Sequence, residues 1–269
     1  MLQEILSAEK IEYFGVLPFS ACECRRPDII SRRGVSPDDV KSAVMLLVPY
    51  YVGDGEGNVS FYARSGDYHV FCEEMFSRVV PKLEKAYGGR FLGFADKSPV
   101  RENVAASMAG LGMLGDNYML ISETYGTFVF VAELLSTVAP ERLGFSGKVA
   151  EPRACPHCGA CKLACPMTDG LDCLSAVTQK KGTLSTEEEA YLRRHGYAWG
   201  CDICQLACPF TRAAIAAGVE TPIDFFRKDR ISTLTTERLA AMDDEAFERR
   251  AFSWRGREVL ARNLKILEK

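Results

Sequence analysis

The feature that decides the fold is a short stretch from Cys155 to Pro166, which reads CPHCGACKLACP. Its cysteines have the spacing C-x2-C-x2-C-x3-C, and a proline follows the last of them. A second stretch, from Cys201 to Pro209, reads CDICQLACP and has the same ending with one cysteine fewer. We call these the first and the second cysteine run. Eight of the 11 cysteines in the chain lie between Cys155 and Cys208, so the chemistry of this region rests on its thiols.

The cellular compartment decides between disulfide bonds and metal ligation. The chain begins MLQEILSAEK, which lacks the basic segment and the apolar segment of an export signal. We therefore expect a cytoplasmic protein, and the cytosol keeps thiols reduced. Metal ligation accounts better for the clustered cysteines.

The first run matches the cysteine pattern with which bacterial ferredoxins hold [4Fe-4S] clusters. Its first three thiolates wrap around one cluster, whereas the fourth lies beyond a helical turn and faces another cluster. The second run lacks one ligand, which Cys173 can supply although 27 residues separate it from Cys201. The sequence then predicts two clusters, one held by Cys155, Cys158, Cys161 and Cys208 and the other by Cys165, Cys173, Cys201 and Cys204.

Zinc ligation and free thiols account less well for the cysteines. Zinc also binds paired C-x2-C units, but it explains neither the spacing of the first run nor the C-P ending of both runs. Free buried cysteines explain the spacing even less. We interpret His157, inside the first run, as a surface residue, and we assign no role to Cys22 and Cys24.

Composition limits the remaining classes of function. The 269 residues suffice for one large domain or two modest ones at ~150 residues per domain. A formal charge of −3 and 47% apolar residues argue against disorder and against a dominant nucleic-acid-binding surface. Residues 247–269 nevertheless carry seven basic and three acidic side chains, which indicates either an amphipathic helix with a solvated basic face or a contact for phosphates. No apolar run approaches the ~18 residues of a membrane span.

The part of the chain before the cysteine runs predicts a mixed α and β structure. A continuous apolar run at 43–51, AVMLLVPYY, is typical of a buried strand. Further strands are predicted at 90–95, 118–122 and 127–135, and helices at 67–80, where Pro81 disturbs the pattern, and at 102–109. We therefore expect an α+β domain at 1–145, a cysteine-rich module at 146–212 and a helical tail at 213–269.

Several segments, in order along the chain, resemble motifs of epoxyqueuosine reductases. Residues 62–69 (YARSGDYH) are similar to their Y-A-x-G-x-D-Y-H segment, with the glycine moved one place to Gly66. Residues 96–99 (DKSP) resemble D-[ST]-x-P with the hydroxyl residue moved one place to Ser98, and residues 109–121 (AGLGMLGDNYMLI) resemble A-G-L-G-W-x-G followed by L-I. Residues 173–175 (CLS) and 200–209 (GCDICQLACP) are similar to C-[IL]-S and G-C-D-x-C-Q-x-x-C-P.

This resemblance implies an enzyme that uses cobalamin and two [4Fe-4S] clusters to reduce the epoxide of epoxyqueuosine in tRNA to queuosine. The implied fold class is α+β, with a nitroreductase-like corrinoid-binding core, a ferredoxin-like double-cluster module and a short helical tail. Electrons would pass from a donor such as flavodoxin or ferredoxin through the clusters to cobalt. Longer family members continue into HEAT-like repeats that help to hold the tRNA, and we expect this chain to be a short form without them.

The resemblance also indicates candidate site residues. Asp96 falls on the family's catalytic acid, which gives a proton to the leaving oxygen; by itself, it reads as a helix-start residue beside Ser98-Pro99. The predicted contacts of the corrinoid or the substrate are Tyr68, His69, Gly112, Gly115, Asn117, Ser175 and Asp202. A cobalt-ligating D-x-H-x-x-G motif is incomplete, because Cys72 stands in place of its glycine. This agrees with a corrinoid bound without a protein histidine, and equally with no corrinoid.

Three positions depart from the family pattern. Met113 stands where the family has Trp, Asp116 where it has Lys, and Asn103 where it has Arg or Lys. Asp116 therefore places a negative charge in a loop expected near the cofactor. Two other functions stay open, namely a related corrinoid reductase of a small molecule and a ferredoxin-like electron-transfer protein.

Overall fold

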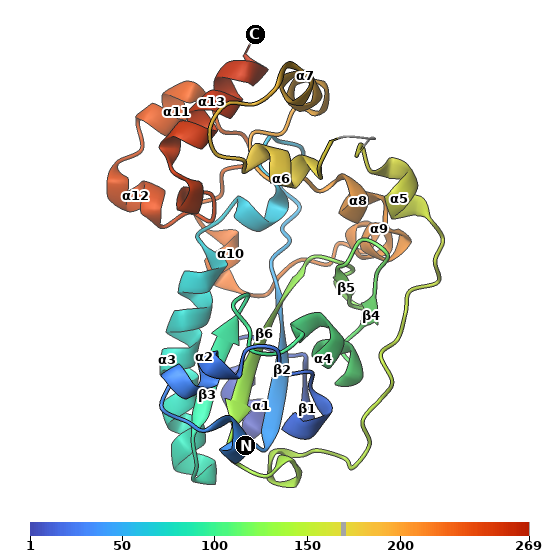
Figure 1. The fold of residues 1–269 in the computed structure, drawn as a ribbon, viewed down its shortest axis with the longest axis vertical. Helices are drawn as coiled ribbons and strands as arrows, with labels where there is room; N and C mark the ends of the chain where they lie inside the picture. The colour runs from blue at the N-terminus through green and yellow to red at the C-terminus, as the bar shows by residue number, and fades with distance from the viewer. Residues whose placement is uncertain (168–170, 269) are drawn as a thin grey trace. The chain divides into compact units, whose positions relative to one another are not determined.

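The computed structural model describes residues 1–167 and 171–268, and Figure 1 labels its helices and strands. The chain divides into two compact units. Unit 1 consists of Met1–Pro49 and Phe71–Cys158, and unit 2 of Tyr50–Val70 and Gly159–Lys269. The mixture of helix and sheet that the sequence predicts is confirmed. The division at residues 145 and 212 stays a prediction.

A four-stranded antiparallel sheet with the order β1-β2-β6-β3 forms the centre of unit 1. Its strands are β1 (Phe14–Pro18), β2 (Ser42–Pro49), β3 (Phe91–Ala95) and β6 (Val129–Ser136). A separate hairpin pairs β4 (Met113–Leu114) with β5 (Leu120–Ile121). Every residue of β2 is buried, and this explains its uninterrupted apolar sequence, because a strand covered on both faces has no solvent side.

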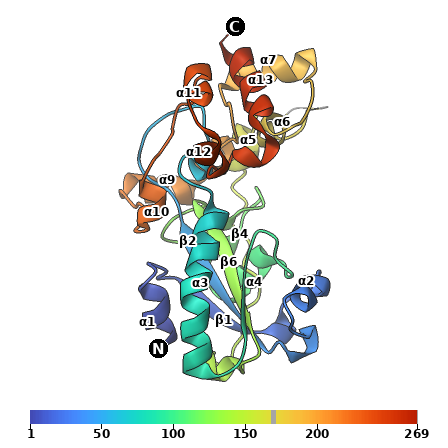
Figure 2. The ribbon, with the colours of Figure 1, turned by 90° about the vertical axis from the view of Figure 1, so that its left-hand side faces the viewer.

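Helices cover both faces of this sheet, as Figure 2 shows. Helices α1 (Leu2–Ser7) and α3 (Tyr68–Tyr87) lie on one face, and α2 (Pro27–Arg32) and α4 (Glu102–Met108) lie on the other. Gly93 in β3 allows α3 to approach, because a Cβ there would lie 2.3 Å from the ring of Phe76. Gly15 in β1 does the same for the end of α4, since its Cβ would lie 2.4 Å from the carbonyl oxygen of Ala109.

Helix α3 corrects one expectation. The helix predicted at 67–80 continues past Pro81 to Tyr87. Pro81 is exposed, so its missing N–H costs the helix one hydrogen bond without burying an unpaired group. Met75 and Leu83 are fully buried on the same helix, and tertiary packing of this kind decides helix stability more than local propensity does.

Unit 2 is built from short helices around a buried core. They are α5 (Ala160–Ala164), α6 (Leu174–Thr178), α7 (Thr186–His195), α8 (Ile203–Ala207), α9 (Pro209–Ala216), α10 (Asp224–Arg227), α11 (Thr236–Ala240), α12 (Asp244–Glu248) and α13 (Arg257–Leu267). Trp199 is fully buried in this core, and its Nε1–H donates to the hydroxyl of Tyr62 at 2.9 Å. Short 3-10 turns of the two units stand at Phe19–Ala21, Pro37–Asp39, Phe61–Ala63, Pro140–Leu143 and Ser253–Arg255.

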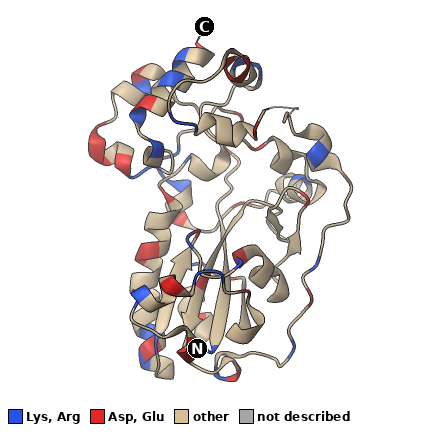
Figure 3. Cartoon of the chain, viewed as in Figure 1, with Lys and Arg blue, Asp and Glu red and all other residues tan. Residues whose placement is uncertain are grey.

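The basic residues near the C-terminus bind the main chain of their own unit. Arg262 donates to the carbonyl oxygens of Lys180 and Gly182, and Arg257 donates to that of Leu239. Acidic and basic side chains are intermixed over α11, α12 and α13 (Figure 3). The solvated basic face expected from the sequence is therefore smaller than the count of basic residues indicates. Over residues 1–167 and 171–268, no helix combines the length and the apolar character that crossing a membrane requires.

Candidate active site

The two cysteine runs have the same local structure. Helix α5 ends at Cys165 (φ −63°, ψ 123°), and α8 ends at Cys208 (φ −66°, ψ 126°). A proline follows each of these cysteines, and a residue before proline avoids helical angles, so the C-P pair ends the helix in both runs. The two helices pack against each other within unit 2. A paired repeat of this kind is typical of a module that holds two clusters by exchanging its last cysteines.

Thiols from the second predicted ligand set share their surroundings. Burial raises the pKa of the Tyr191 phenol to about 12, and the charges of Cys165, Cys173 and Cys201 add to this effect. Burial also raises the pKa of Cys201 to about 12, with contributions from Cys204 and Cys173. Such a thiol keeps its proton at neutral pH unless a metal ion displaces it. Cys173, the ligand least constrained by spacing, is near enough to Cys201 to affect its thiol, and the role of these four thiols as one ligand set stays a prediction.

The other predicted ligand set rests on spacing alone. Cys161 lies in α5, and Cys208 is the residue at which α8 ends. Cys155 and Cys158 belong to unit 1, although Cys158 and Cys161 are only three residues apart along the chain. The role of these four thiols as one ligand set stays a prediction.

A buried carboxylate ties the second run to the segment that starts at Tyr50. Asp202 precedes α8 and is fully buried. It accepts hydrogen bonds from the hydroxyl of Ser60 at 2.6 Å and the main-chain N–H of Phe61 at 2.9 Å. Gln205 Nε2 also donates to it at 3.2 Å, and Gln205 Oε1 accepts from the Tyr50 hydroxyl. Burial still raises the pKa of Asp202 to about 6. These contacts explain the acid and the amide of the C-D-x-C-Q motif, whereas a corrinoid contact of Asp202 stays a prediction.

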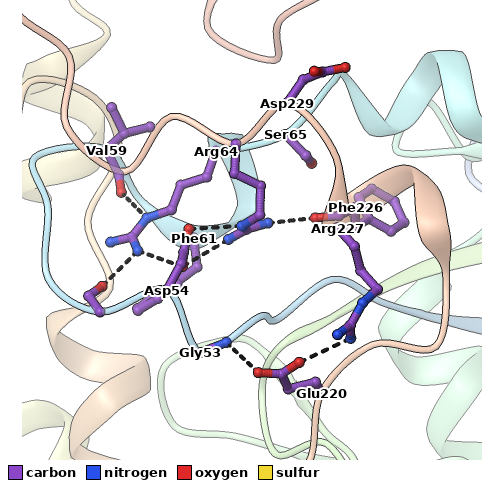
Figure 4. Close-up of polar contacts among 12 residues, drawn as sticks. Gly53, Asp54, Val59, Phe61, Arg64, Ser65, Glu220, Phe226, Arg227 and Asp229 are labelled. Carbon is purple, nitrogen blue, oxygen red and sulfur yellow. Dashed lines mark hydrogen bonds and ion pairs between the residues drawn. The ribbon is translucent and has the colours of Figure 1, made fainter.

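A buried ion-pair network fixes the same segment (Figure 4). The carboxylate of Asp54 accepts from Arg64 Nη1 at 2.8 Å and from Arg230 Nε at 2.8 Å. The side chain of Arg64 is 2% exposed, and its Nε–H donates to the carbonyl oxygen of Val59. A buried guanidinium needs a charged partner, so Asp54 joins two parts of unit 2 that are far apart in the sequence. The sequence analysis missed this network.

The motif that resembles Y-A-x-G-x-D-Y-H forms a local cluster at the start of α3. His69 Nδ1 lies 2.9 Å from Asp67 Oδ1, and the His69 ring lies 4.1 Å from that of Tyr68, measured between centroids. Ser175, a further predicted contact in unit 2, lies in α6 and accepts a hydrogen bond from Gln179 Nε2 at 2.9 Å. Tyr68, His69 and Ser175 are each partly exposed.

Asp96 lies in unit 1, immediately after β3, and is exposed. Its φ of +63° is uncommon for a residue other than glycine, so its surroundings must hold it. The turn that follows it is held at Pro99, whose carbonyl oxygen accepts from the main-chain N–H groups of Arg25 at 2.8 Å and Arg26 at 3.0 Å. The interpretation of Asp96 as a helix-start residue is wrong, because α4 begins at Glu102 with Arg101 as its N-cap.

Two glutamates beside the Asp96 turn have perturbed carboxyl groups. Burial raises the pKa of Glu102 to about 8, and the charge of Asp96 adds to this shift. Burial also raises the pKa of Glu133, in β6, well above its ordinary value. Among the residues described, neither Oε2 atom has a hydrogen-bond partner, and both are buried. The sequence analysis missed both residues, although a single acid in the apolar run FVFVAELL was a signal for Glu133.

The predicted corrinoid contacts of unit 1 lie together in the β4–β5 hairpin. A Cβ at Gly112 would lie 2.4 Å from the carbonyl oxygen of Ile121, and a Cβ at Gly115 would lie 2.4 Å from Asn117 Oδ1. The hairpin itself therefore requires Gly112, whereas the close contact at Gly115 is with the end of the Asn117 side chain. Asn117 Nδ2 is buried without a hydrogen-bond partner within the described part of the chain. Such an orphaned donor suits a hydrogen bond to a ligand.

The structure accounts for the three departures from the family pattern. Asn103, in α4, donates from Nδ2 to the carbonyl oxygen of Tyr118 at 3.1 Å and so joins α4 to the hairpin loop. Asp116 Oδ1 lies 2.7 Å from Nδ1 of His157, which is exposed as the sequence predicts. The negative charge of Asp116 thus faces an imidazole. Met113 is buried in β4 and contributes to the hairpin's packing.

Comparison with known proteins shows which proteins this chain is related to. No protein-family model matches the chain. It is 31% identical over 225 residues to the epoxyqueuosine reductase of Gloeobacter violaceus, an alignment that covers 78% of this chain and 69% of that protein. It covers 66% and 54% of two further epoxyqueuosine reductases.

Solved structures agree with this relationship. The chain resembles an epoxyqueuosine reductase from Streptococcus thermophilus with a TM-score of 0.76 and 23% identity, covering 99% of this chain and 79% of that one. It also resembles an epoxyqueuosine reductase crystallised with an epoxyqueuosine-modified tRNA-Tyr stem loop, with a TM-score of 0.75 and 20% identity, covering 98% and 80%. At these identities the structures establish the fold, and the identity to the Gloeobacter protein establishes the relationship. The chain belongs to the epoxyqueuosine reductase family.

Proposed function

We propose that this chain reduces the epoxide of epoxyqueuosine in tRNA to queuosine, with two [4Fe-4S] clusters and cobalamin as cofactors. The observation that carries the proposal is that a chain of this family has two helix-Cys-Pro units packed together, α5 with Cys165 and α8 with Cys208. An enzyme that reduces one substrate through two clusters needs this pairing, because electrons move between clusters held close together.

The proposed function also implies a fold type for each of three segments of the chain. We assign residues 1–145 to a nitroreductase-like core, 146–212 to a ferredoxin-like module and 213–269 to a helical tail. The antiparallel sheet with helices on both faces supports the first assignment. The repeated local structure of the two cysteine runs supports the second.

The donor groups fit the proposed cofactors. Cys165, Cys173, Cys201 and Cys204 would hold one cluster, and Cys155, Cys158, Cys161 and Cys208 the other. Asn117 is the best supported corrinoid contact, because its buried Nδ2 has no partner in the described chain. The further proposed contacts are Tyr68, His69, Gly112, Gly115, Ser175 and Asp202. When bound, the clusters supply electrons one at a time and the corrinoid supplies a cobalt of low potential.

Asp96 supplies a proton in the proposed reaction. Removing the epoxide oxygen as water consumes two electrons and two protons, and a positioned carboxylic acid delivers a proton to the leaving oxygen. Asp96 is exposed, and Ser98, two residues later, donates a hydrogen bond to the buried Glu133 of β6.

The proposed substrate is a tRNA, and the proposed electron donor is a flavodoxin or ferredoxin. A solved relative binds an epoxyqueuosine-modified tRNA stem loop, which supports the first assignment. Arg257 and Arg262 are engaged with main-chain carbonyls, so they contribute less to binding phosphates than their number indicates.

Reconstitution tests the proposal. The protein is purified anaerobically with added cobalamin, iron, sulfide and cobalt are counted, and an epoxyqueuosine-modified stem loop is added with a reductant. We expect about eight irons per chain, one bound corrinoid, and queuosine detected by mass spectrometry. A loaded enzyme that leaves the stem loop unchanged would favour a small-molecule reductase, whereas iron without cobalt would favour an electron-transfer protein.

Replacing Cys173 by serine tests the more uncertain cluster ligand. We expect the iron content to fall from about eight to about four per chain, because one cluster loses a thiolate and the other keeps its set. Iron and sulfide counts with the reduced protein's electron paramagnetic resonance spectrum measure the loss. Cys24→Ser is the matched control, and it should keep the full iron content. Full iron content in the Cys173 variant would place the missing ligand elsewhere.

A further inference from the structure

We propose that Thr178 and Asn263 are positioning residues for Cys173, the proposed cluster ligand that belongs to neither cysteine run. Hydrogen bonds of these two residues join helix α6, which Cys173 precedes, to the start of the second cysteine run. The inference rests on the proposed ligand set of Cys165, Cys173, Cys201 and Cys204. All the residues that carry it belong to unit 2.

Cys173 needs a constraint that its local sequence does not supply. Inside each cysteine run, neighbouring ligands are two or three residues apart, so the chain itself keeps them close. Cys173 is separated from Cys201 by 27 residues. Groups that contact a ligand's own segment orient the ligand and hold it in place. Contacts between α6 and the second run must therefore place Cys173 beside Cys201.

Thr178, the last residue of α6, makes such a contact. Its Oγ1 accepts from the main-chain N–H of Gly200 at 3.0 Å, and its hydroxyl donates to the carbonyl oxygen of Ser175 at 2.7 Å. Thr178 is fully buried, so water does not compete for these bonds. Helix α6 has five residues and is about 7.5 Å long at 1.5 Å per residue. Fixing Thr178 at the residue before Cys201 therefore also restrains Cys173 at the other end of α6.

Asn263, in α13, makes a second connection between the same segments. It is fully buried, and its Nδ2 donates to the carbonyl oxygens of Thr178 at 2.7 Å and Ala198 at 2.9 Å. A side-chain amide has two N–H donors, so both are used here. Its Oδ1 accepts from Arg262 Nε at 3.1 Å and Nη2 at 2.9 Å. The amide is therefore fully bonded, and its direction is fixed, because carbonyl oxygens can only accept.

Other contacts of the second run have a different direction. The carboxylate of Asp202 ties the run to residues 60–61. The apolar cluster that includes residues of α6 also packs against Cys201, which adds attraction, but hydrophobic contacts are not directional. Thr178 and Asn263 thus supply directional bonds between α6 and the second run.

Thr178→Val is the first test. The methyl group fills the place of the hydroxyl, but the N–H of Gly200 loses its acceptor. In anaerobically reconstituted protein, we expect about half of the iron to pass to an added chelator about 10- to 100-fold faster than in the wild type. The other half should leave at the wild-type rate, because the second ligand set is untouched. Thr178→Ser keeps the oxygen and should release iron as the wild type does.

Thr221→Val is the matched control for the loss of a buried threonine hydroxyl. Thr221 lies in unit 2, is 1% exposed, and accepts from the main-chain N–H of Ile223 at 3.1 Å. It should leave the release of iron unchanged. If Thr178→Val acts through Cys173, adding it to Cys173→Ser should not speed the release of the remaining iron, because the affected cluster is already absent.

Asn263→Leu tests the second connection. The side chain keeps a similar size but loses both donors, so the same half of the iron should be released faster. Lys265→Ala is its control, since Lys265 is an exposed residue of the same helix. The electron paramagnetic resonance spectrum of the reduced protein, recorded during release, should lose the signal of one cluster before that of the other.

The proposal is overturned if Thr178→Val releases iron at the wild-type rate, or if Thr178→Ser is as impaired as Thr178→Val. Equal acceleration of both halves of the iron would also refute it, because a general loosening of unit 2 affects both clusters. Wild-type protein that binds about eight irons but leaves the stem loop unchanged would instead refute the proposed function. The rates of iron release would still decide on Thr178 and Asn263.

Discussion

Asp96→Asn is expected to lower kcat on the epoxyqueuosine stem loop by about 100- to 10,000-fold, the usual contribution of a positioned general acid. The amide has the shape of the carboxyl group but is a far weaker acid, so it does not protonate the leaving oxygen. The substitution suits the backbone, because asparagine tolerates the left-handed φ of +63° at this position better than most residues. The loss should therefore fall on kcat, with iron content and thermal midpoint unchanged.

Single-turnover reduction of the stem loop by pre-reduced, cluster-loaded enzyme measures this loss. Asp28→Asn is a suitable control, since Asp28 is an exposed acid in α2 that pairs with Arg26. It should have wild-type kcat. A rate for Asp96→Asn within a factor of about two of the wild type would show that another group supplies the proton.

Asp54→Ala is expected to lower the free energy of unfolding by about 3 kcal/mol, the lower end of the range for breaking a buried ion pair. Arg64 is 2% exposed and Arg230 is 9% exposed, so both guanidinium groups would lose their carboxylate where water reaches them poorly. Asp54 itself is 21% exposed, and for this reason we take the lower end. The thermal midpoint should fall by roughly 6–12 °C.

Thermal unfolding of the cluster-loaded protein under anaerobic conditions tests this prediction. Glu189→Ala is the matched control in unit 2, because Glu189 pairs with Arg193 at the surface of α7. An exposed pair of this spacing contributes about 0.3–0.5 kcal/mol. Equal shifts in the two variants would contradict a special role for Asp54.

Local patterns allowed part of the structure to be predicted. The spacing of the cysteines and the two C-P pairs predict where α5 and α8 end, because the proline acts on the residue immediately before it. The apolar run at 43–51 predicts β2, since a strand buried on both faces has no polar positions. The family motifs indicated Asp96 in the same way, through residues that are adjacent in the chain.

Long-range contacts could not be predicted, because they depend on where the chain returns. Glu133 and Ser98 are 35 residues apart, and Asp54 and Arg230 are 176 residues apart. No periodicity relates such pairs. Gly112 differs from these pairs. A glycine-rich turn suggests a ligand site, but the close approach of the Ile121 carbonyl oxygen already requires glycine at this position.

The sequence by itself thus determined the family motifs, and it predicted the thiols for two clusters and the candidate acid. These depend on residue type and on spacing over a few residues, which covalent geometry preserves. Only the tertiary structure decided that residues 50–70 belong to unit 2, that α3 passes Pro81, and that the buried Glu133 accepts a hydrogen bond from Ser98. Burial and long-range hydrogen bonds cause these features, and both arise only when distant segments pack together.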